Sequence, residues 1–241
     1  MVGDERVKTG IPGLDEIISG GFKRGSIITI TGDSGCGKTT FAMQFIWAGI
    51  TRYNEPGLYV SFEEERDYLF DNLKGYGWNL HELEKQKKLL FYEYPPQEVD
   101  RFVNQETLIK DAIDEHGVRR VAIDSVTSLA LLYETEHRRR EELVRLLGKL
   151  RRWNCTIVMT SESTTKAGQP RARFGVETLT DGLIYLYNLR KGNVRQRALE
   201  VIKLRGTNFE QRICPMRFTE KGIAIYPNEQ VYETESFERL R

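Results

Sequence analysis

The fold of this chain is decided by one stretch, Gly32-Asp33-Ser34-Gly35-Cys36-Gly37-Lys38-Thr39, which fits the pattern G-x-x-x-x-G-K-[ST] of a phosphate-binding P-loop. The glycines let the backbone turn its N–H groups inward around phosphate oxygens. Lys38 can reach the terminal phosphates of a nucleotide, and Thr39 offers a hydroxyl to Mg²⁺. With Thr40 as the next residue, we expect a phosphate site over residues 32–40.

The flanking sequence supports this interpretation. Residues 26–31 are a short β-branched run, which is typical of a buried strand. Residues 40–48 have apolar side chains at helical spacing. Strand, glycine loop and helix is the order that a P-loop requires, and it argues against a glycine-rich turn without a ligand.

Bulk composition narrows the function classes. The chain has 241 residues, 39% of them hydrophobic and 29% charged, with a net charge of +1. That balance argues against a polybasic partner of nucleic acid or membrane. No apolar run is long enough for a membrane span, and the N-terminus lacks the apolar core of a signal peptide. Three cysteines without metal-ligand spacing fit a reducing cytoplasm.

Alternating strand and helix patterns predict an α/β fold with a mostly parallel sheet and helices on both faces. We expect one domain over residues 1–241, with residues 1–25 leading into the first core strand. Beyond the P-loop strand, the expected strands are 57–62, 88–93, 120–124 and 155–160, and the expected helices are 66–76, 80–86, 105–116 and 138–153.

The last third of the chain has a different pattern. Residues 182–189, 196–204 and 223–226 resemble strands without long helices between them. Antiparallel strands that extend one edge of the sheet would account for this. The polar tail over 228–241 either frays or packs on a neighbour.

Asp124 is the candidate second ligand of Mg²⁺. It ends the run 120–124, in which a basic residue and apolar residues precede the acid, as in a Walker B strand. The carboxyl end of a strand beside the P-loop is where α/β sheets bind ligands. A plain strand-terminating aspartate is the alternative, and the P-loop upstream makes it the weaker one.

Two polar runs follow other strands. Glu63, Glu64 and Glu65 come after the second strand, where a carboxylate near the γ-phosphate can polarise a water molecule. Composition alone favours a solvated helix start, and Glu65 fits that alternative. Residues 160–162 end the fifth expected strand and could sense the γ-phosphate, or they could simply begin a polar loop.

Two basic groups have competing interpretations. Lys203 and Arg205 share one face of a late strand and could clamp a phosphate, although from the residues alone a solvated edge strand is the favoured interpretation. Residues 138–140 read most simply as a solvated helix start. With Arg171 and Arg173 they could instead form a nucleic-acid patch.

Several segments together resemble the KaiC-domain ATPases, which belong to the RecA superfamily. The resemblance extends from about Thr9 to Pro227. Within the family, the chain resembles the single-domain type found in archaea. Its motifs are Thr9-Gly10-Ile11-Pro12-Gly13-Leu14-Asp15 with Gly20-Gly21, Phe62-Glu63-Glu64, Gly77-Trp78-Asn79-Leu80, Phe174-Gly175-Val176-Glu177 and Lys203-Leu204-Arg205-Gly206-Thr207.

This resemblance implies a RecA-like fold and hexameric rings with ATP and Mg²⁺ between protomers. In that family the paired glutamates hydrolyse ATP, which assigns Glu63 and Glu64 as the catalytic pair. Lys203 and Arg205 would project into the neighbour's site and act in trans on the γ-phosphate, as arginine fingers do. Slow hydrolysis tied to regulation or signalling is the function implied.

The chain also departs from the family pattern. The cyanobacterial clock members carry two such domains, and their autokinase half has a Ser-Thr pair where this chain has Glu177 and Thr178. Phosphorylation of Thr178 and a circadian role are therefore not expected. Two further hypotheses remain: a RecA- or RadA-like DNA-binding ATPase, and a nucleotide-gated assembly scaffold with little turnover.

Overall fold

The computed structural model describes residues 5–95, 98–166, 169–191 and 193–231. Its strands are β1 (Arg6–Val7), β2 (Phe22–Lys23), β3 (Ile27–Gly32), β4 (Gly57–Ser61), β5 (Leu89–Glu93), β6 (Arg120–Asp124), β7 (Thr156–Lys166), β8 (Gln169–Ala172), β9 (Gly182–Lys191), β10 (Val194–Leu204), β11 (Ile213–Thr219) and β12 (Gly222–Ile225). Its helices are α1 (Leu14–Ile17), α2 (Lys38–Tyr53), α3 (Arg66–Leu73), α4 (Leu80–Lys85), α5 (Val99–Asn104), α6 (Glu106–His116), α7 (Val126–Leu131) and α8 (Glu136–Arg151), with 3₁₀ turns at η1 (Lys74–Tyr76) and η3 (Arg173–Thr178).

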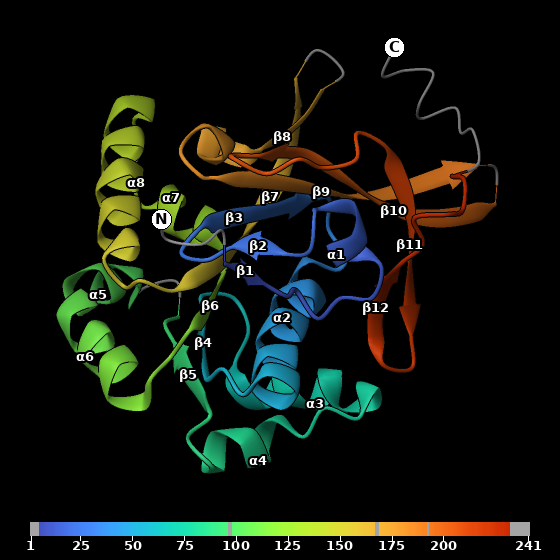
Figure 1. Ribbon diagram of the computed structural model, residues 1–241. Coiled ribbons are helices and arrows are strands. Elements are labelled where there is room, and N and C mark those ends of the chain that lie inside the picture. The colour runs from blue at the N-terminus through green and yellow to red at the C-terminus, as the bar shows by residue number, and fades with distance from the viewer. Residues whose placement is uncertain (1–4, 96–97, 167–168, 192, 232–241) are drawn as a thin grey trace.

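A ten-stranded sheet forms the centre of the molecule (Figure 1). The strand order is β12-β11-β10-β9-β3-β7-β6-β4-β5, with β8 paired to β7. The strands from β9 to β5 in this order run parallel. Strands β3, β4 and β6 are buried along their whole length, because helices cover both faces. The predicted RecA-like α/β fold is confirmed.

The C-terminal strands β10, β11 and β12 continue the sheet with antiparallel pairing beyond β9. This confirms the antiparallel extension predicted for the last third. Strand β11 was not predicted. Its Pro215 pairs opposite Ala198 within the sheet, and a proline is a signal against an interior strand.

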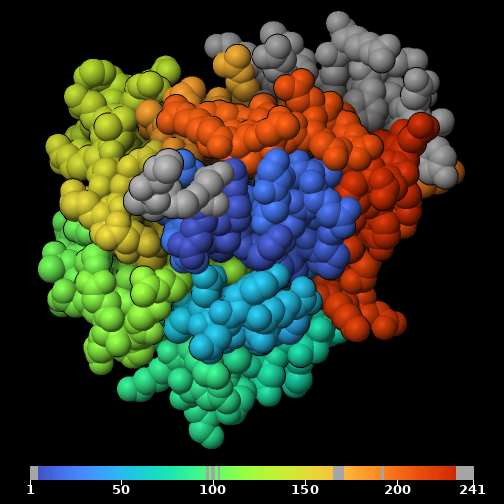
Figure 2. All heavy atoms as spheres, viewed as in Figure 1, coloured from blue at the N-terminus to red at the C-terminus, as the bar shows by residue number. Residues whose placement is uncertain are grey.

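Two hydrophobic cores lie on opposite faces of the sheet. One core holds α1, α2, α3 and α4 against the sheet, and the other holds α5, α6, α7 and α8. Figure 1 shows these two groups of helices on different sides. The N-terminal segment belongs to the first core, and Figure 2 shows it (dark blue) between the C-terminal strands and α2.

Several expected boundaries were wrong. The strand expected to end at Thr160 continues to Lys166 and forms a hairpin with β8. The helix expected from Arg138 begins at Glu136, and α5 and α7 were missed. Most of the predicted tail, residues 232–241, lies outside the described residues.

A buried guanidinium joins two elements of the first core. Arg120 at the start of β6 is 1% exposed, and its Nε donates to Glu55 at 2.6 Å. Its Nη1 donates to the carbonyl of Phe45 at 3.1 Å. Cδ and Nε of Arg120 lie 2.3 and 2.4 Å from where a Cβ on Gly49 would stand, so α2 can pass over Arg120 only with glycine at that position.

Candidate nucleotide site

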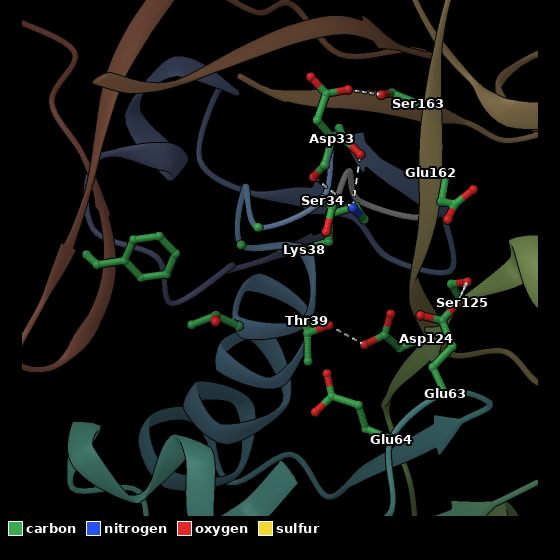
Figure 3. Close-up of a pocket in the computed structure, with 15 residues that line it drawn as sticks. Asp33, Ser34, Lys38, Thr39, Glu63, Glu64, Asp124, Ser125, Glu162 and Ser163 are labelled. Carbon is green, nitrogen blue, oxygen red and sulfur yellow. Dashed lines mark hydrogen bonds between the residues drawn. The ribbon is translucent and has the colours of Figure 1, made fainter. Parts of the chain in front are cut away.

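A cavity of about 510 Å³ opens at the carboxyl ends of β3, β4, β6 and β7 (Figure 3). This volume falls in the usual range for small-molecule sites. The residues that line it are Gly32, Asp33, Ser34, Gly35, Gly37, Lys38, Thr39, Thr40, Glu63, Glu64, Asp124, Ser125, Glu162, Ser163 and Phe218. Segments far apart in sequence thus meet at one edge of the sheet.

The P-loop connects β3 to α2 through backbone conformations that favour glycine. Gly35 and Gly37 have φ of 73° and 107°. Gly37 also packs against Phe218, whose ring would stand 2.6 Å from an added Cβ. Helix α2 begins directly afterwards, at Lys38. Its first N–H groups and its dipole therefore favour an anion in the cavity.

Cys36 is the one predicted P-loop residue whose side chain does not line the cavity. It is fully buried in the core under α2, and burial raises the pKa of its thiol. Only its backbone can take part in phosphate binding.

Lys38 is folded across the loop that it follows. Its Nζ donates to the carbonyls of Gly32 at 2.9 Å and Asp33 at 3.1 Å. These contacts hold the ammonium group over the centre of the loop (Figure 3). From there it faces any phosphate cradled by the loop.

Thr39 and Asp124 meet at the base of the cavity, where the Thr39 hydroxyl donates to Asp124 Oδ2 at 2.7 Å. Tyr59 donates to the same oxygen at 2.7 Å, and Thr160 donates to Oδ1. The carboxylate is thereby fixed in orientation. Burial, followed by the charge of Asp124, raises the pKa of Tyr59 well above its ordinary value, so the phenol keeps its proton.

These two oxygens fit a magnesium ion. The described residues contain no cluster of three or more histidine, cysteine or acidic side chains that could hold a metal. Mg²⁺ is usually bound by one or two protein oxygens, with the other positions taken by water and substrate phosphate. A hydroxyl and a carboxylate beside a phosphate loop meet that requirement.

The two glutamates after β4 have different surroundings. Glu63 Oε1 accepts hydrogen bonds from Ser125 at 2.5 Å and Ser128 at 2.9 Å. Glu64 is half-buried and points toward Asp124 and Thr39 (Figure 3). Burial, then the charges of Asp124 and Glu63, raises the pKa of Glu64. Glu65, expected at a solvated helix start, is the N-cap position of α3.

Two further lining residues come from the extension of β7. Ser163 donates to Asp33 of the P-loop at 2.5 Å, and Glu162 forms an ion pair with Arg173. Of the polar run 160–162, Glu162 lines the cavity, and its role as a γ-phosphate sensor stays a prediction. Ser163 and Phe218 were missed, because neither shows a local sequence signal that connects it with the P-loop.

Lys203 and Arg205 lie away from the cavity of their own chain. Leu204 pairs with Gly182, which pairs with Ile28 at the amino end of β3. The cavity opens beyond Gly32, about 13 Å further along that strand.

The two cations instead bind the segment before β9. Lys203 donates to the carbonyls of Glu177 and Thr180, both at 2.7 Å. Arg205 donates to the carbonyl of Thr178 at 3.2 Å. Burial, and then the charge of Arg205, lowers the pKa of Lys203. Within one chain these residues are structural.

The arginines at the start of α8 are less available than the sequence indicated. Arg139 donates to the carbonyl of Ala130 at 2.9 Å and lies 4.3 Å from the ring centroid of Phe174. Arg140 donates to the hydroxyl of Thr178 at 3.5 Å. The expectation of a fully solvated helix start is therefore wrong for Arg139, and the candidate nucleic-acid patch is correspondingly smaller. Among the described helices, none is long and apolar enough to span a membrane.

Comparison with known proteins identifies the same architecture. The family described as "ATPase: KaiC" matches residues 7–230. The chain is 38% identical to the circadian clock oscillator protein KaiC of Parathermosynechococcus lividus over 233 residues, which is 93% of this chain and 43% of that protein. It is also 38% identical to the protein of that name from Synechococcus elongatus, covering 92% of this chain and 44% of that one.

A solved structure agrees along almost its whole length. The crystal structure of a KaiC-like protein from Pyrococcus horikoshii OT3 superposes with a TM-score of 0.83 at 35% identity, covering 92% of this chain and 99% of that one. This chain spans less than half the length of the two clock proteins, so their activities as whole proteins do not transfer. With a P-loop, a Thr39–Asp124 pair and a family match over nearly its full length, the chain belongs to the KaiC family of nucleotide-binding ATPases.

Proposed function

We propose that this protein hydrolyses Mg·ATP slowly at sites between the subunits of a ring, and that this serves regulation or signalling. The observation that carries the proposal is the arrangement at the base of the cavity. The Thr39 hydroxyl and Asp124 Oδ2 are 2.7 Å apart, and Glu63 and Glu64 lie beside this pair (Figure 3). A cytoplasmic location, expected from the cysteine usage, stays a prediction.

Residues 32–40 would bind the phosphates, with Lys38 on the β- and γ-phosphates. A Mg²⁺ ion held by Thr39 and Asp124 would neutralise charge that develops on the phosphates. Glu63 is our candidate for the base that orients the attacking water, because two serines fix its carboxylate. Glu64 would assist by completing the negative surface next to the metal site. The adenine ring of the bound nucleotide would extend toward Phe218, which lines the cavity.

Lys203 and Arg205 are proposed to act in trans. Their position at the amino end of the sheet, away from the cavity in their own chain, favours a role toward a neighbouring copy. A hexameric ring would place each such edge against the next cavity. Phosphate transfer to Thr178 within one chain is disfavoured by the same separation, because Thr178 lies beside Arg205.

The test is Glu63→Gln, with phosphate release and ATP binding measured on the same samples. We expect kcat to fall by about 10²–10⁴ while ATP still binds, because only the proton acceptor is lost. Lys38→Ala serves as the reference for lost phosphate binding. An unchanged kcat in Glu63→Gln would remove Glu63 from the mechanism. A wild-type protein that binds ATP without releasing phosphate would favour the scaffold hypothesis.

A further inference from the structure

Strand β5 leaves one edge of the sheet uncovered. It ends the strand order next to β4, and no described strand pairs with its outer side (Figure 1). The N–H of Tyr94 and the carbonyl of Lys88 bond toward β4, both at 2.9 Å. Because a strand alternates, Phe91 and Glu93 direct their backbone groups outward. Such an edge is a template for another strand.

A hollow lies on each face of the sheet along this edge. On the face of α5 and α6, a hollow of about 320 Å³ has a mixed lining, made of Phe91, Tyr92, Tyr94, Leu108 and Ile109 together with Glu93, Arg101 and Gln105. Leu108, on its wall, is 65% exposed and is therefore available for contact. Arg101 lines the same hollow, where it is paired with Glu98 at 2.9 Å, and Glu93 contributes a carboxylate. We call this the mixed hollow.

The hollow on the face of α3 and α4 measures about 270 Å³ and is acidic. Its walls carry Glu65, Asp67, Glu84 and Glu93, against the single guanidinium of Arg66. We call this the acidic hollow. An added strand would send alternate side chains to the two hollows, because neighbouring residues of a strand point to opposite faces. This is the geometry of β-strand addition, in which the backbone gives affinity and the side-chain pockets give specificity.

We propose that the outer edge of β5 binds residues 237–241 of a second copy of this chain as an added strand. These residues, Phe-Glu-Arg-Leu-Arg, lie outside the described part of the structure. Their alternation matches the two hollows. Arg239 and Arg241 share one face and complement the acidic hollow, where Phe237 meets Phe91. Leu240 and Glu238 share the other face and complement Leu108 and Arg101.

The reach of the chain favours a second copy over the same one. The last described residue, Val231, packs against a cluster formed by side chains of β9 and by Ala198 of β10. Strand β9 lies five spacings from β5 in the sheet order, which is about 24 Å. Residues 232–239 cover about 26 Å when fully extended. A docking within one chain would leave the segment almost no slack.

The proposed contact joins two different surfaces, one at each side of the molecule. Such a head-to-tail contact produces closed rings or open filaments. The inference is independent of ATP hydrolysis, because it concerns only the outer edge of β5. This edge ends the strand order opposite β12. A chain that assembles in this way without turning over ATP would support this inference and contradict the proposed function.

Disulfide cross-linking between copies tests the contact directly. One pool carries Leu108→Cys, and a second pool with a mass tag carries Leu240→Cys. The three native cysteines are free and buried, so they do not compete. We expect mild oxidation of the mixed pools, without nucleotide, to give the mixed dimer. Val144→Cys in place of Leu108→Cys is the matched control, because Val144 is 50% exposed on the distant α8.

A charge exchange gives a second readout. Arg239→Glu with Arg241→Glu should weaken association by roughly fivefold to tenfold, measured by sedimentation. Glu65→Lys with Glu84→Lys in the same chain should restore it. The proposal is overturned if Leu240→Cys couples equally well to the Val144→Cys control. It is also overturned if the Leu108→Cys/Leu240→Cys double variant closes within a single chain, or if the charge exchange leaves association unchanged.

Discussion

Glu63 and Glu64 are adjacent in sequence, yet the protein treats their carboxylates differently. Glu63 is held by two serine hydroxyls from the segment after β6. Glu64 faces another carboxylate, and its pKa is raised by burial, then by Asp124 and Glu63. A side chain held in an unfavourable charge environment is typical of a functional site rather than of a stabilising one.

Glu64→Gln tests this at the residue scale. An acid whose pKa is raised in the folded state costs stability once it ionises, so its cost appears as pH rises through that pKa. We expect the Glu64→Gln protein to melt about 2 °C higher than the wild type at pH 7. The difference should disappear as pH falls below the ordinary pKa of glutamate. Thermal melting from pH 4 to pH 8 measures it.

The control for this prediction is Glu65→Gln. Glu65 is exposed at the start of α3. The melting temperature of the Glu65→Gln protein should show no comparable rise at pH 7. An equal rise in both variants would mean that general charge reduction, and not the local repulsion at Glu64, is responsible.

Local chemistry made part of the site predictable. Asp124 ends a recognisable strand, Thr39 and Glu63 come after one, and the carboxyl ends of parallel strands meet at one edge of a sheet. Phe218 could not be found in this way. It reaches the P-loop because β11 and β12 fold back over α2, and that contact depends on tertiary packing. The inward-facing Cys36 was unpredictable for the same reason.

At the scale of elements, α2 depends on one glycine. An alanine at position 49 would put its Cβ within 2.3 Å of the buried Arg120 side chain. Arg120 cannot move without losing its bonds to Glu55 and Phe45. We expect Gly49→Ala to lower the free energy of unfolding by about 1–3 kcal/mol, despite the better helix propensity of alanine. Urea denaturation measures it.

Gly148 provides the matched control within α8. An added Cβ there has no heavy atom within 4 Å. Gly148→Ala should therefore raise the free energy of unfolding by about 0.5–1 kcal/mol, through helix propensity alone. If both alanine variants shift the urea midpoint in the same direction, the role assigned to the Arg120 contact is incorrect.

Helices and strands were predicted correctly where the apolar residues of a segment form a strong pattern. They were predicted wrongly where strand pairing decides the structure of a polar segment. The apolar run of β6 and the leucine stripe of α8 both gave the correct type. The polar end of β7 resembled a loop, but it is a strand because β8 pairs with it. Helix α7 was missed because its six residues are too few to show a helical period.

At the scale of the whole molecule, the trans role of Lys203 and Arg205 can be separated from a structural one. Lys203→Ala leaves the P-loop intact, and Lys38→Ala leaves Lys203 intact. If catalysis needs both from different copies, an equal mixture should recover activity that neither variant shows alone. Random association leaves about one site in four with both parts present. Phosphate release from the mixture measures it.

The mass of the assembly belongs in the same experiment. Light scattering with and without Mg·ATP should show a species near six protomers when nucleotide is present. A protein that stays monomeric at micromolar concentration would leave Lys203 and Arg205 bound only to their own chain. No recovery in a mixture that does form rings would contradict their catalytic role.

The contact between Gly49 and Arg120 also has an evolutionary consequence. The two positions share one volume inside the molecule, so a larger residue at either one excludes the side chain now present at the other. Substitutions at them should therefore arise as pairs. Among descendants of a common ancestor, a lineage that first lost the arginine of β6 could then replace the glycine of α2. A lineage that still has the arginine could not replace the glycine first.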